Sequence, residues 1–223
     1  MTEREFLRSV PLFSRLGEGS LDSILRLTRR KRFRKDEVVF HEKEVGDTLY
    51  VILRGRVKVA IFGDDGKEVT LSSLTEGDFF GEMAVLDQEP RSATVIAEEE
   101  CELLSLQRDD FTRAIETDPG ISASLVQVLA ARLRKANHQI STLALLDVYG
   151  RVARVIQELA EEEGKRLKDG RVVVRRPTHM DIAHRIGSSR ETVTRMMRDL
   201  EEAGHLETQG REIFLRPDFQ NLF

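Results

Sequence analysis

Two short apolar stripes interrupted by one glycine constrain the fold of this chain more than any other feature. Apolar residues recur at helical spacing before Gly187, the pattern stops there, and it resumes after Arg190. The apolar positions are Ile182, Ala183, Ile186, Val193, Met196, Met197 and Leu200. Such a pattern fits two helices joined by a tight turn. We predict a helix-turn-helix in which Ser188 or Ser189 is the N-cap of the second helix.

The second of these helices carries polar side chains on the face opposite its apolar stripe. They are Ser189, Arg190, Glu191, Thr192, Thr194 and Arg195. In a DNA major groove, arginine pairs with guanine O6 and N7, and glutamate accepts from cytosine N4. A solvated helix with paired charges is the alternative. The surrounding helix-turn-helix pattern favours a recognition helix, so double-stranded DNA is the predicted partner.

Length and composition restrict the number of domains, the mode of DNA binding and the cellular compartment. The 223 residues suffice for two modest domains, and the formal net charge of -4 supplies no global positive field, so DNA binding must depend on local placement of cations. A single cysteine, Cys101, excludes disulfides within the chain and cysteine-ligated iron–sulfur clusters, and it favours the reducing cytoplasm. We find no signal-peptide pattern and no run of about 18 apolar residues, so we expect no membrane association.

Residues 33–106 predict a small antiparallel barrel or roll. Short apolar strands are expected at 38–40, 49–62, 69–74, 92–97 and 102–106. Turn residues separate them at Gly46-Asp47, Gly55, Gly63 to Gly66 and Gly77-Asp78. The N-terminal segment, through Leu27, predicts short helices packed on this roll.

Residues 119–146 predict a long helix with a coiled-coil seam. Apolar side chains follow alternating spacings of three and four at Val126, Leu129, Leu133, Ala136, Ile140 and Leu143. A helix packed on its own roll is the alternative, although such helices usually show a broader stripe. A seam this narrow predicts a homodimer. Asp147 is expected to cap the next helix, 148–163, which puts a hinge near Leu146-Asp147, and 206–215 predicts a hairpin wing.

A second segment has the chemistry of a phosphate and sugar site. Gly81 opens a short helix whose amide N–H groups suit an anion. Met83, two residues after Gly81, and Ala93, two residues after Arg91, are also expected to line the site. Arg91 adds a bidentate cation and Ser92 a hydroxyl, while the Glu82 carboxylate suits a ribose hydroxyl. An Arg91–Glu82 pair across a turn is the alternative.

These segments, in this order, resemble the cyclic-AMP receptor protein branch of the bacterial family that also contains the fumarate-nitrate regulators. The resemblance rests on Gly46 to Gly55, Phe80 to Ala84, Pro90 to Thr94, Leu143 to Gly150 and Ser189 to Arg195. It implies an α+β chain with a cyclic-nucleotide-binding β-roll of jelly-roll type (1–118), a coiled-coil dimerisation helix (119–146) and a winged helix-turn-helix (147–223).

The resemblance also implies roles for the site residues. Gly81, Glu82, Arg91 and Ser92 would hold the ribose and cyclic phosphate of cyclic AMP, and Arg190, Glu191 and Arg195 would read a half-site resembling TGTGA, repeated as TCACA. In the cyclic-AMP receptor protein, a threonine and a serine meet the adenine. Ala136 and Asn137 take these positions here, and the Asn137 amide could bond adenine instead. The loop at 87–90 is one residue shorter than in the best-known member.

We weigh several alternative ligands and functions against this prediction. Cyclic di-GMP, cyclic GMP or no ligand are the alternatives to cyclic AMP, and a constitutive DNA-binding dimer is the alternative regulator. His41, His138, His179, His184 and His205 lack metal-site spacing, so no metal, iron–sulfur cluster or haem is expected. We find no nucleophile-and-base pattern, so the chain is not expected to be an enzyme. The run at 161–166 is read as a solvated helix end and loop, or as a surface for RNA polymerase.

Overall fold

The computed structural model describes residues 2–219. The chain divides into two compact units, one made of residues 1–61 with 70–135 and the other of residues 62–69 with 136–223. Met1 and residues 220–223, at the ends of the predicted first and third segments, lie outside the described residues. The long helix α5 (Pro119–Leu145) belongs to both units.

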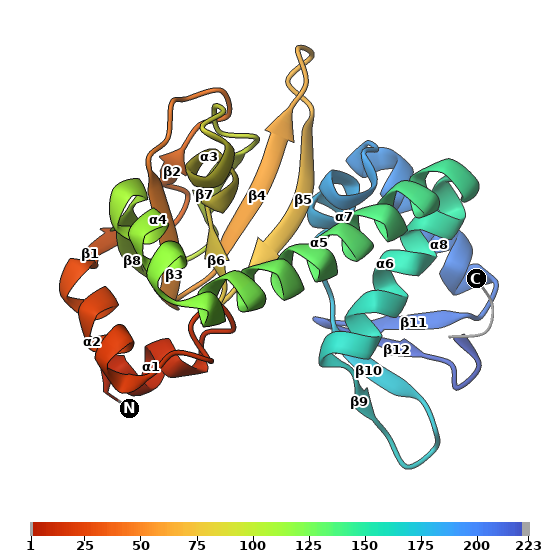
Figure 1. The fold of residues 1–223 in the computed structure, drawn as a ribbon. Helices are drawn as coiled ribbons and strands as arrows, with labels where there is room; N and C mark the ends of the chain where they lie inside the picture. Colours follow the sequence, from red (N-terminus) through yellow and green to blue (C-terminus); the bar gives the residue numbers. More distant parts are fainter. Residues whose placement is uncertain (1, 220–223) are drawn as a thin grey trace. The chain divides into compact units, whose positions relative to one another are not determined.

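The first unit is an antiparallel roll. Its strands are β1 (Arg29–Phe33), β2 (Val38–Phe40), β3 (Thr48–Arg54), β4 (Val57–Phe62), β5 (Glu68–Leu74), β6 (Phe79–Phe80), β7 (Thr94–Ala97) and β8 (Cys101–Gln107). They form two sheets with the orders β1-β8-β3-β6 and β2-β7-β4-β5 (Figure 1). Successive side chains of β3 belong to two different hydrophobic cores. Leu49 and Val51 pack with the short helices described below, while Tyr50 and Ile52 pack with other strands inside the roll.

Short helices pack against the sheet that contains β3 and β8. They are α1 (Glu3–Ser9), α2 (Glu18–Leu27) and α4 (Arg108–Thr117), and a further short helix, α3 (Glu82–Asp87), follows β6. Thr2 begins α1 with a capping box that also uses Glu5. Leu7, Leu21 and Phe111 are fully buried against β3 and β8. The predicted packing of N-terminal helices on the roll is confirmed.

Two strand predictions need correction. The roll begins at Arg29 rather than near Phe33, because backbone pairing with β8, from Arg29 opposite Ser105 to Phe33 opposite Cys101, makes a strand of a charged segment that lacks apolar alternation. Conversely, β7 begins at Thr94, so Ser92 lies in the preceding loop. The predicted strand at 49–62 is two strands separated at Gly55, the expected turn.

The helix α5 presents two different apolar faces. Ile121 and Leu125 are buried in the core of the first unit, and Leu129 packs against it. Most of the other seam residues are exposed: Val126 is 66% exposed, and Leu133 and Ile140 are each 62% exposed. Packing on its own roll therefore accounts for Leu129 but leaves most of the predicted seam in solvent.

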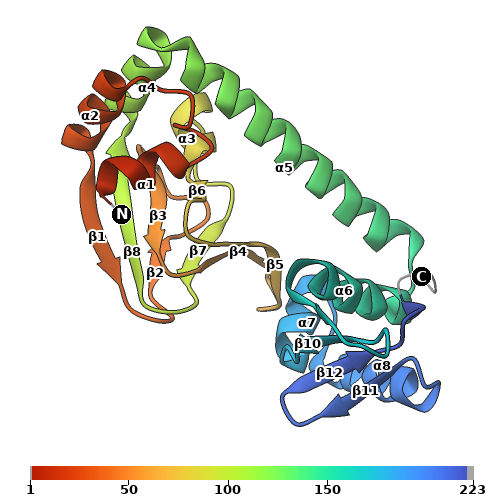
Figure 2. The ribbon, with the colours of Figure 1, turned by 90° about the horizontal axis from the view of Figure 1, so that it is seen from below.

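The second unit is a winged helix-turn-helix. Its elements are α6 (Val148–Glu163), β9 (Lys165–Arg166), β10 (Val172–Arg175), α7 (His179–Ile186), α8 (Arg190–Glu202), β11 (Leu206–Gln209) and β12 (Glu212–Leu215). The sheet has the order β11-β12-β10-β9, and α6, α7 and α8 pack together beside it around one core (Figure 2). The run at 161–166 is not all loop, because Lys165 and Arg166 pair with β10.

Local signals in this unit are confirmed. Asp147 caps α6, and its carboxylate accepts from the Gly150 amide at 2.8 Å. Gly187 ends α7 with a left-handed φ of 63°, which favours glycine. Ser189 is the N-cap of α8 and accepts from the Thr192 amide. In residues 2–219 no helix is long and apolar enough to cross a membrane.

Candidate ligand pocket and nucleic-acid interface

The turn into α3 is shaped by a glycine. Gly81 has a φ of 80°, in the left-handed region, and it is the N-cap of α3. A Cβ at this position would lie 2.6 Å from Nη1 of Arg91 and 3.0 Å from the carbonyl oxygen of Thr48. Both the backbone conformation and this close approach require glycine. The turn thereby brings a guanidinium against the start of α3.

Arg91 is buried beneath this turn, with only 5% of its surface exposed. Its Nη1 donates to the carbonyl of Gly81 and its Nη2 to the carbonyl of Thr48, both at 2.8 Å. The guanidinium carbon also lies 4.1 Å from the ring centre of Phe40. Arg91 is therefore held rigidly, and these bonds use two of the five N–H groups that a guanidinium carries.

The electrostatic setting of Arg91 suits an anion. Burial lowers the pKa of Arg91, and the positive charge of Arg108 lowers it further, whereas Tyr50, Asp47 and Glu82 act in the opposite direction. Arg108 is anchored by donation from Nη2 to the carbonyls of Gly46 and Ala84. A negative group beside Arg91 would relieve both the burial and the repulsion.

Glu82 is also buried, and its partner comes from α5. Its Oε1 accepts from Nη1 of Arg132 at 2.7 Å, and Arg132 also donates to the Phe79 carbonyl and stacks on the Phe79 ring. The simple Arg91–Glu82 pair considered above is therefore wrong. Sequence analysis missed Arg132, because nothing in the sequence relates a polar position of α5 to α3.

The remaining predicted ligand residues are divided between the two units. Met83 is half exposed, and its sulfur accepts from the hydroxyl of Ser92 at 3.6 Å. Ala93 is buried. Asn137 lies exposed on α5, in the part of that helix that belongs to the second unit. The structure thus brings Gly81, Glu82, Met83, Arg91, Ser92 and Ala93 together in the first unit.

In the second unit, the outward face of α8 carries the predicted DNA-reading side chains. Arg190, Glu191 and Arg195 are exposed, while Val193 and Met197 are buried in the core. The pKa of Glu191 is lowered by its own backbone amide and by Ser189, so the side chain carries charge. Geometry thus leaves two cations and one anion available on the face that points away from the core.

The hydroxyls of this face are engaged within the protein. Ser189 Oγ and Thr192 Oγ1 lie 3.0 Å apart at the N-cap. Thr194 Oγ1 donates to the Arg190 carbonyl and lies 2.8 Å from Nδ1 of His179. These three residues therefore shape the start and the side of α8.

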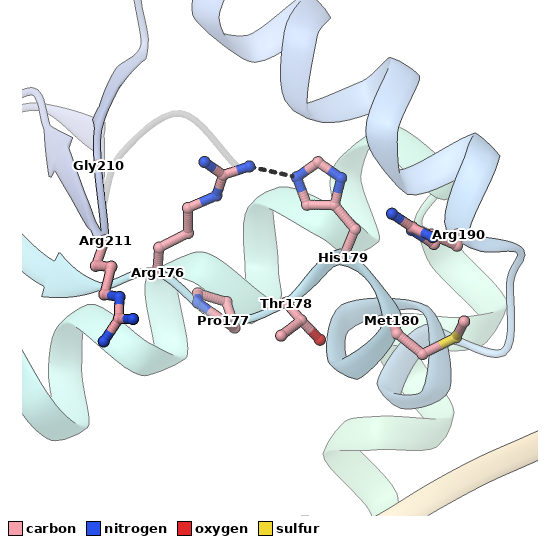
Figure 3. A pocket seen from close by; sticks show the side chains of 8 residues that line it. All are labelled: Arg176, Pro177, Thr178, His179, Met180, Arg190, Gly210 and Arg211. Carbon is pink, nitrogen blue, oxygen red and sulfur yellow. Dashed lines mark hydrogen bonds between the residues drawn. The ribbon is translucent and has the colours of Figure 1, made fainter.

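A cavity of about 550 Å³ adjoins the start of α8 (Figure 3). It is lined by Arg176, Pro177, Thr178, His179, Met180, Arg190, Gly210 and Arg211. Its lining thus includes three arginines, one from α8, one from the segment before α7 and one from the turn between β11 and β12. Sequence analysis missed Arg176 and Arg211, although the basic pair before the Thr178 cap was a usable signal. Residues 2–219 hold no cluster of three or more His, Cys, Asp or Glu residues that could bind a metal ion.

Comparisons with known proteins identify a family for each of the two domains. The cyclic nucleotide-binding domain family matches residues 30–118, and the Crp-like helix-turn-helix domain family matches residues 150–222. The chain is 31% identical over 211 residues to the CRP-like cAMP-activated global transcriptional regulator of Mycobacterium tuberculosis, covering 95% of this chain and 94% of that protein. This protein belongs to the cyclic-AMP receptor protein family of bacterial transcription regulators.

Other regulators are also similar to this chain. The cAMP-activated global transcriptional regulator Vfr of Pseudomonas aeruginosa is 34% identical over 86% of this chain and 91% of its own length. Among solved structures, the c-di-GMP responsive global regulator CLP of Xanthomonas campestris superposes with a TM-score of 0.78 at 26% identity, covering 89% of this chain and 99% of that one. The family thus combines a cyclic nucleotide-binding domain with DNA binding, while its named effectors differ.

Proposed function

We propose that this protein is a homodimeric, sequence-specific transcription regulator whose DNA binding is controlled by cyclic AMP. The observation that carries this proposal is the buried Arg91, which is fixed by two backbone carbonyls beside the N-cap of α3. A rigid cation at a glycine turn suits a cyclic phosphate, because the donors need no reorganisation when the anion arrives.

The ribose would be received by Glu82. Its Oε1 already accepts from Arg132, so a ribose hydroxyl would donate to the other carboxylate oxygen or displace the guanidinium. Both events involve the carboxylate that α5 contacts through Arg132. Because α5 also carries the exposed seam, this contact couples the ligand pocket to the dimerisation helix.

The adenine contact is assigned to Asn137, the position at which the family resemblance places a hydroxyl. An amide can both donate to and accept from the adenine edge, whereas Ala136 can do neither. This substitution is the strongest reason to compare ligands experimentally.

Dimerisation would bury the exposed stripe of α5. Large apolar side chains that are each 62% exposed, as Leu133 and Ile140 are, lose this exposure when two such helices pair. A symmetric pair would present two α8 helices to successive major grooves about 34 Å apart, matching a palindrome of the form TGTGA-N6-TCACA. Arg190 and Arg195 would donate to guanines, and Glu191 would accept from a cytosine.

The cellular role follows from this assignment. The protein would act in the cytoplasm as a regulator without catalytic activity, with DNA and RNA polymerase as its partners. Cyclic AMP would be an effector rather than a cofactor.

Two other functions have specific support. The CLP structure belongs to a regulator described as c-di-GMP responsive, and its fold similarity to this chain makes that ligand the main alternative effector. The Arg132–Glu82 pair already occupies one oxygen of the proposed ribose acceptor, which favours a constitutive dimer with a structural roll if no nucleotide displaces it.

One experiment separates these functions. The full-length protein is titrated by calorimetry with cyclic AMP, cyclic GMP and cyclic di-GMP, and a DNA shift assay is repeated with each nucleotide. We expect cyclic AMP to bind and to strengthen DNA binding. Binding and activation by cyclic di-GMP alone would support the first alternative, and DNA binding unaffected by all three would support the second.

A further inference from the structure

We propose that the cavity beside α8 binds one phosphate of the DNA backbone, and that His179 binds this phosphate as an imidazolium, so that DNA binding takes up protons. This inference rests on the proposed DNA-binding function and adds a ligand site and a pH dependence to it. The phosphate site would lie next to the base-reading face of α8 and would carry no sequence information of its own.

Charge supports an anionic ligand. Arg176, Arg190 and Arg211 line the cavity together with His179, and the other lining residues carry no carboxylate. In a chain with a net charge of -4, three guanidinium groups around one cavity form a local positive field. In Figure 3 the Arg176 guanidinium and the His179 ring face each other, and Arg190 lies beyond the imidazole at the start of α8.

Hydrogen bonds fix how His179 is protonated in the free protein. The single hydroxyl hydrogen of Thr194 goes to the Arg190 carbonyl at 2.9 Å. Nδ1 of His179, 2.8 Å from the same hydroxyl oxygen, must then be the donor. Nε2 is left to accept from Nη2 of Arg176 at 3.3 Å. The network therefore assigns a neutral imidazole that holds Arg176.

The surroundings of His179 disfavour its protonated form in the free protein. Burial lowers the pKa of His179, Arg176 and Arg190 lower it further, and Glu201 acts against them. Glu191, Arg195 and Arg198 of α8 line the neighbouring cavity that His179 shares, and Arg211 lies across the first cavity. A phosphate that accepts from Arg176 would free Nε2, which then takes up a proton from a hydronium ion or a buffer acid in solution and donates to the same phosphate. The bound anion raises the pKa, so affinity for DNA increases as pH falls.

The test measures DNA affinity of the full-length protein with saturating cyclic AMP from pH 8 to pH 6 at constant salt. We use a duplex containing TGTGA-N6-TCACA and an unrelated duplex of equal length. Each proton taken up changes affinity by up to about tenfold per pH unit, and we expect at least about a fivefold gain for the wild type on both duplexes. Calorimetry in two buffers of different ionisation enthalpy should show net proton uptake.

Two variants and one control isolate His179. His179→Gln should lose the pH dependence, and His179→Arg should bind at pH 8 as the wild type does at pH 6. His184→Gln, on the same helix, should retain the wild-type pH dependence. A pH dependence unchanged in His179→Gln, or absent in the wild type while the palindrome is still preferred, would overturn this inference alone. Failure to bind either duplex at any pH would overturn it together with the proposed function.

Discussion

Arg132, on the long helix α5, donates to the buried carboxylate of Glu82 at 2.7 Å. The Glu82 side chain is 6% exposed and that of Arg132 is 32% exposed, so the carboxylate depends on this guanidinium for compensation of its charge. The ligand pocket and the helix that carries the seam are therefore joined by one ion pair, which a ribose hydroxyl bound at Glu82 would either share or displace.

Removing Arg132 should destabilise the first unit. We expect Arg132→Ala to lower the free energy of unfolding by about 1–3 kcal/mol, because the buried Glu82 carboxyl group would lose its charged hydrogen-bond partner. Denaturant unfolding measures this change. Arg134→Ala, at an exposed position of the same helix, should change stability by less than about 0.5 kcal/mol. Equal effects of the two substitutions would refute the role given to the pair.

Arg91 should determine phosphate binding. Arg91→Lys keeps the charge but not the two fixed N–H bonds, so cyclic AMP affinity should fall about tenfold to a hundredfold. Arg91→Ala should also lower thermal stability, because the side chain is buried and bonds two carbonyls. Calorimetry with Arg54→Lys as the exposed control checks this, and a wild-type affinity in Arg91→Lys would place the phosphate elsewhere.

The dimer should dissociate without unfolding when the seam is charged. Leu133 and Ile140 are exposed in the single chain, so Leu133→Glu with Ile140→Glu should leave the core of the first unit intact while placing like charges in the interface. Light scattering should report a monomer with a wild-type circular dichroism spectrum. Lys135→Glu, exposed and outside the seam, should remain a dimer. A dimer that survived both seam substitutions would exclude this interface.

Glu191 should discriminate bases rather than add affinity. Glu191→Ala removes an anion from a DNA interface, so nonspecific affinity should rise while the preference at one cytosine falls by about 1–3 kcal/mol. Selection from randomised duplexes measures both effects. Glu202→Ala removes the same charge at the far end of α8 and should preserve every preference. If Glu191→Ala preserved them too, α8 would not read bases in this way.

Most of the fold could be predicted because its signals are local. Asp147 and Ser189 cap helices where the sequence indicates, and the helix predicted at 148–163 has these bounds. The strand β1 could not be found in this way, since Arg29 to Arg32 carry no apolar pattern and become a strand only by pairing with β8. Nonlocal pairing of this kind leaves no periodicity in the sequence.

In the candidate sites, too, residues from one segment could be predicted together, but contacts between separate elements could not. Gly81 and Arg91 share a segment, so their chemistry could be predicted together, whereas Arg132 reaches Glu82 from 50 residues along the chain. His179 was read as one of several scattered histidines. Its relation to Arg176 and Thr194 depends on the packing of α7 against α8, which residue spacing does not specify.

The central claim is that a nucleotide in the first unit controls DNA binding by the second. It is tested most directly by measuring affinity for the TGTGA-N6-TCACA duplex with and without cyclic AMP, in the wild type and in Glu82→Gln. We predict that cyclic AMP strengthens wild-type binding by at least about tenfold, within the usual range of allosteric coupling, and that Glu82→Gln loses most of this gain. An affinity that is the same with and without cyclic AMP would contradict the account.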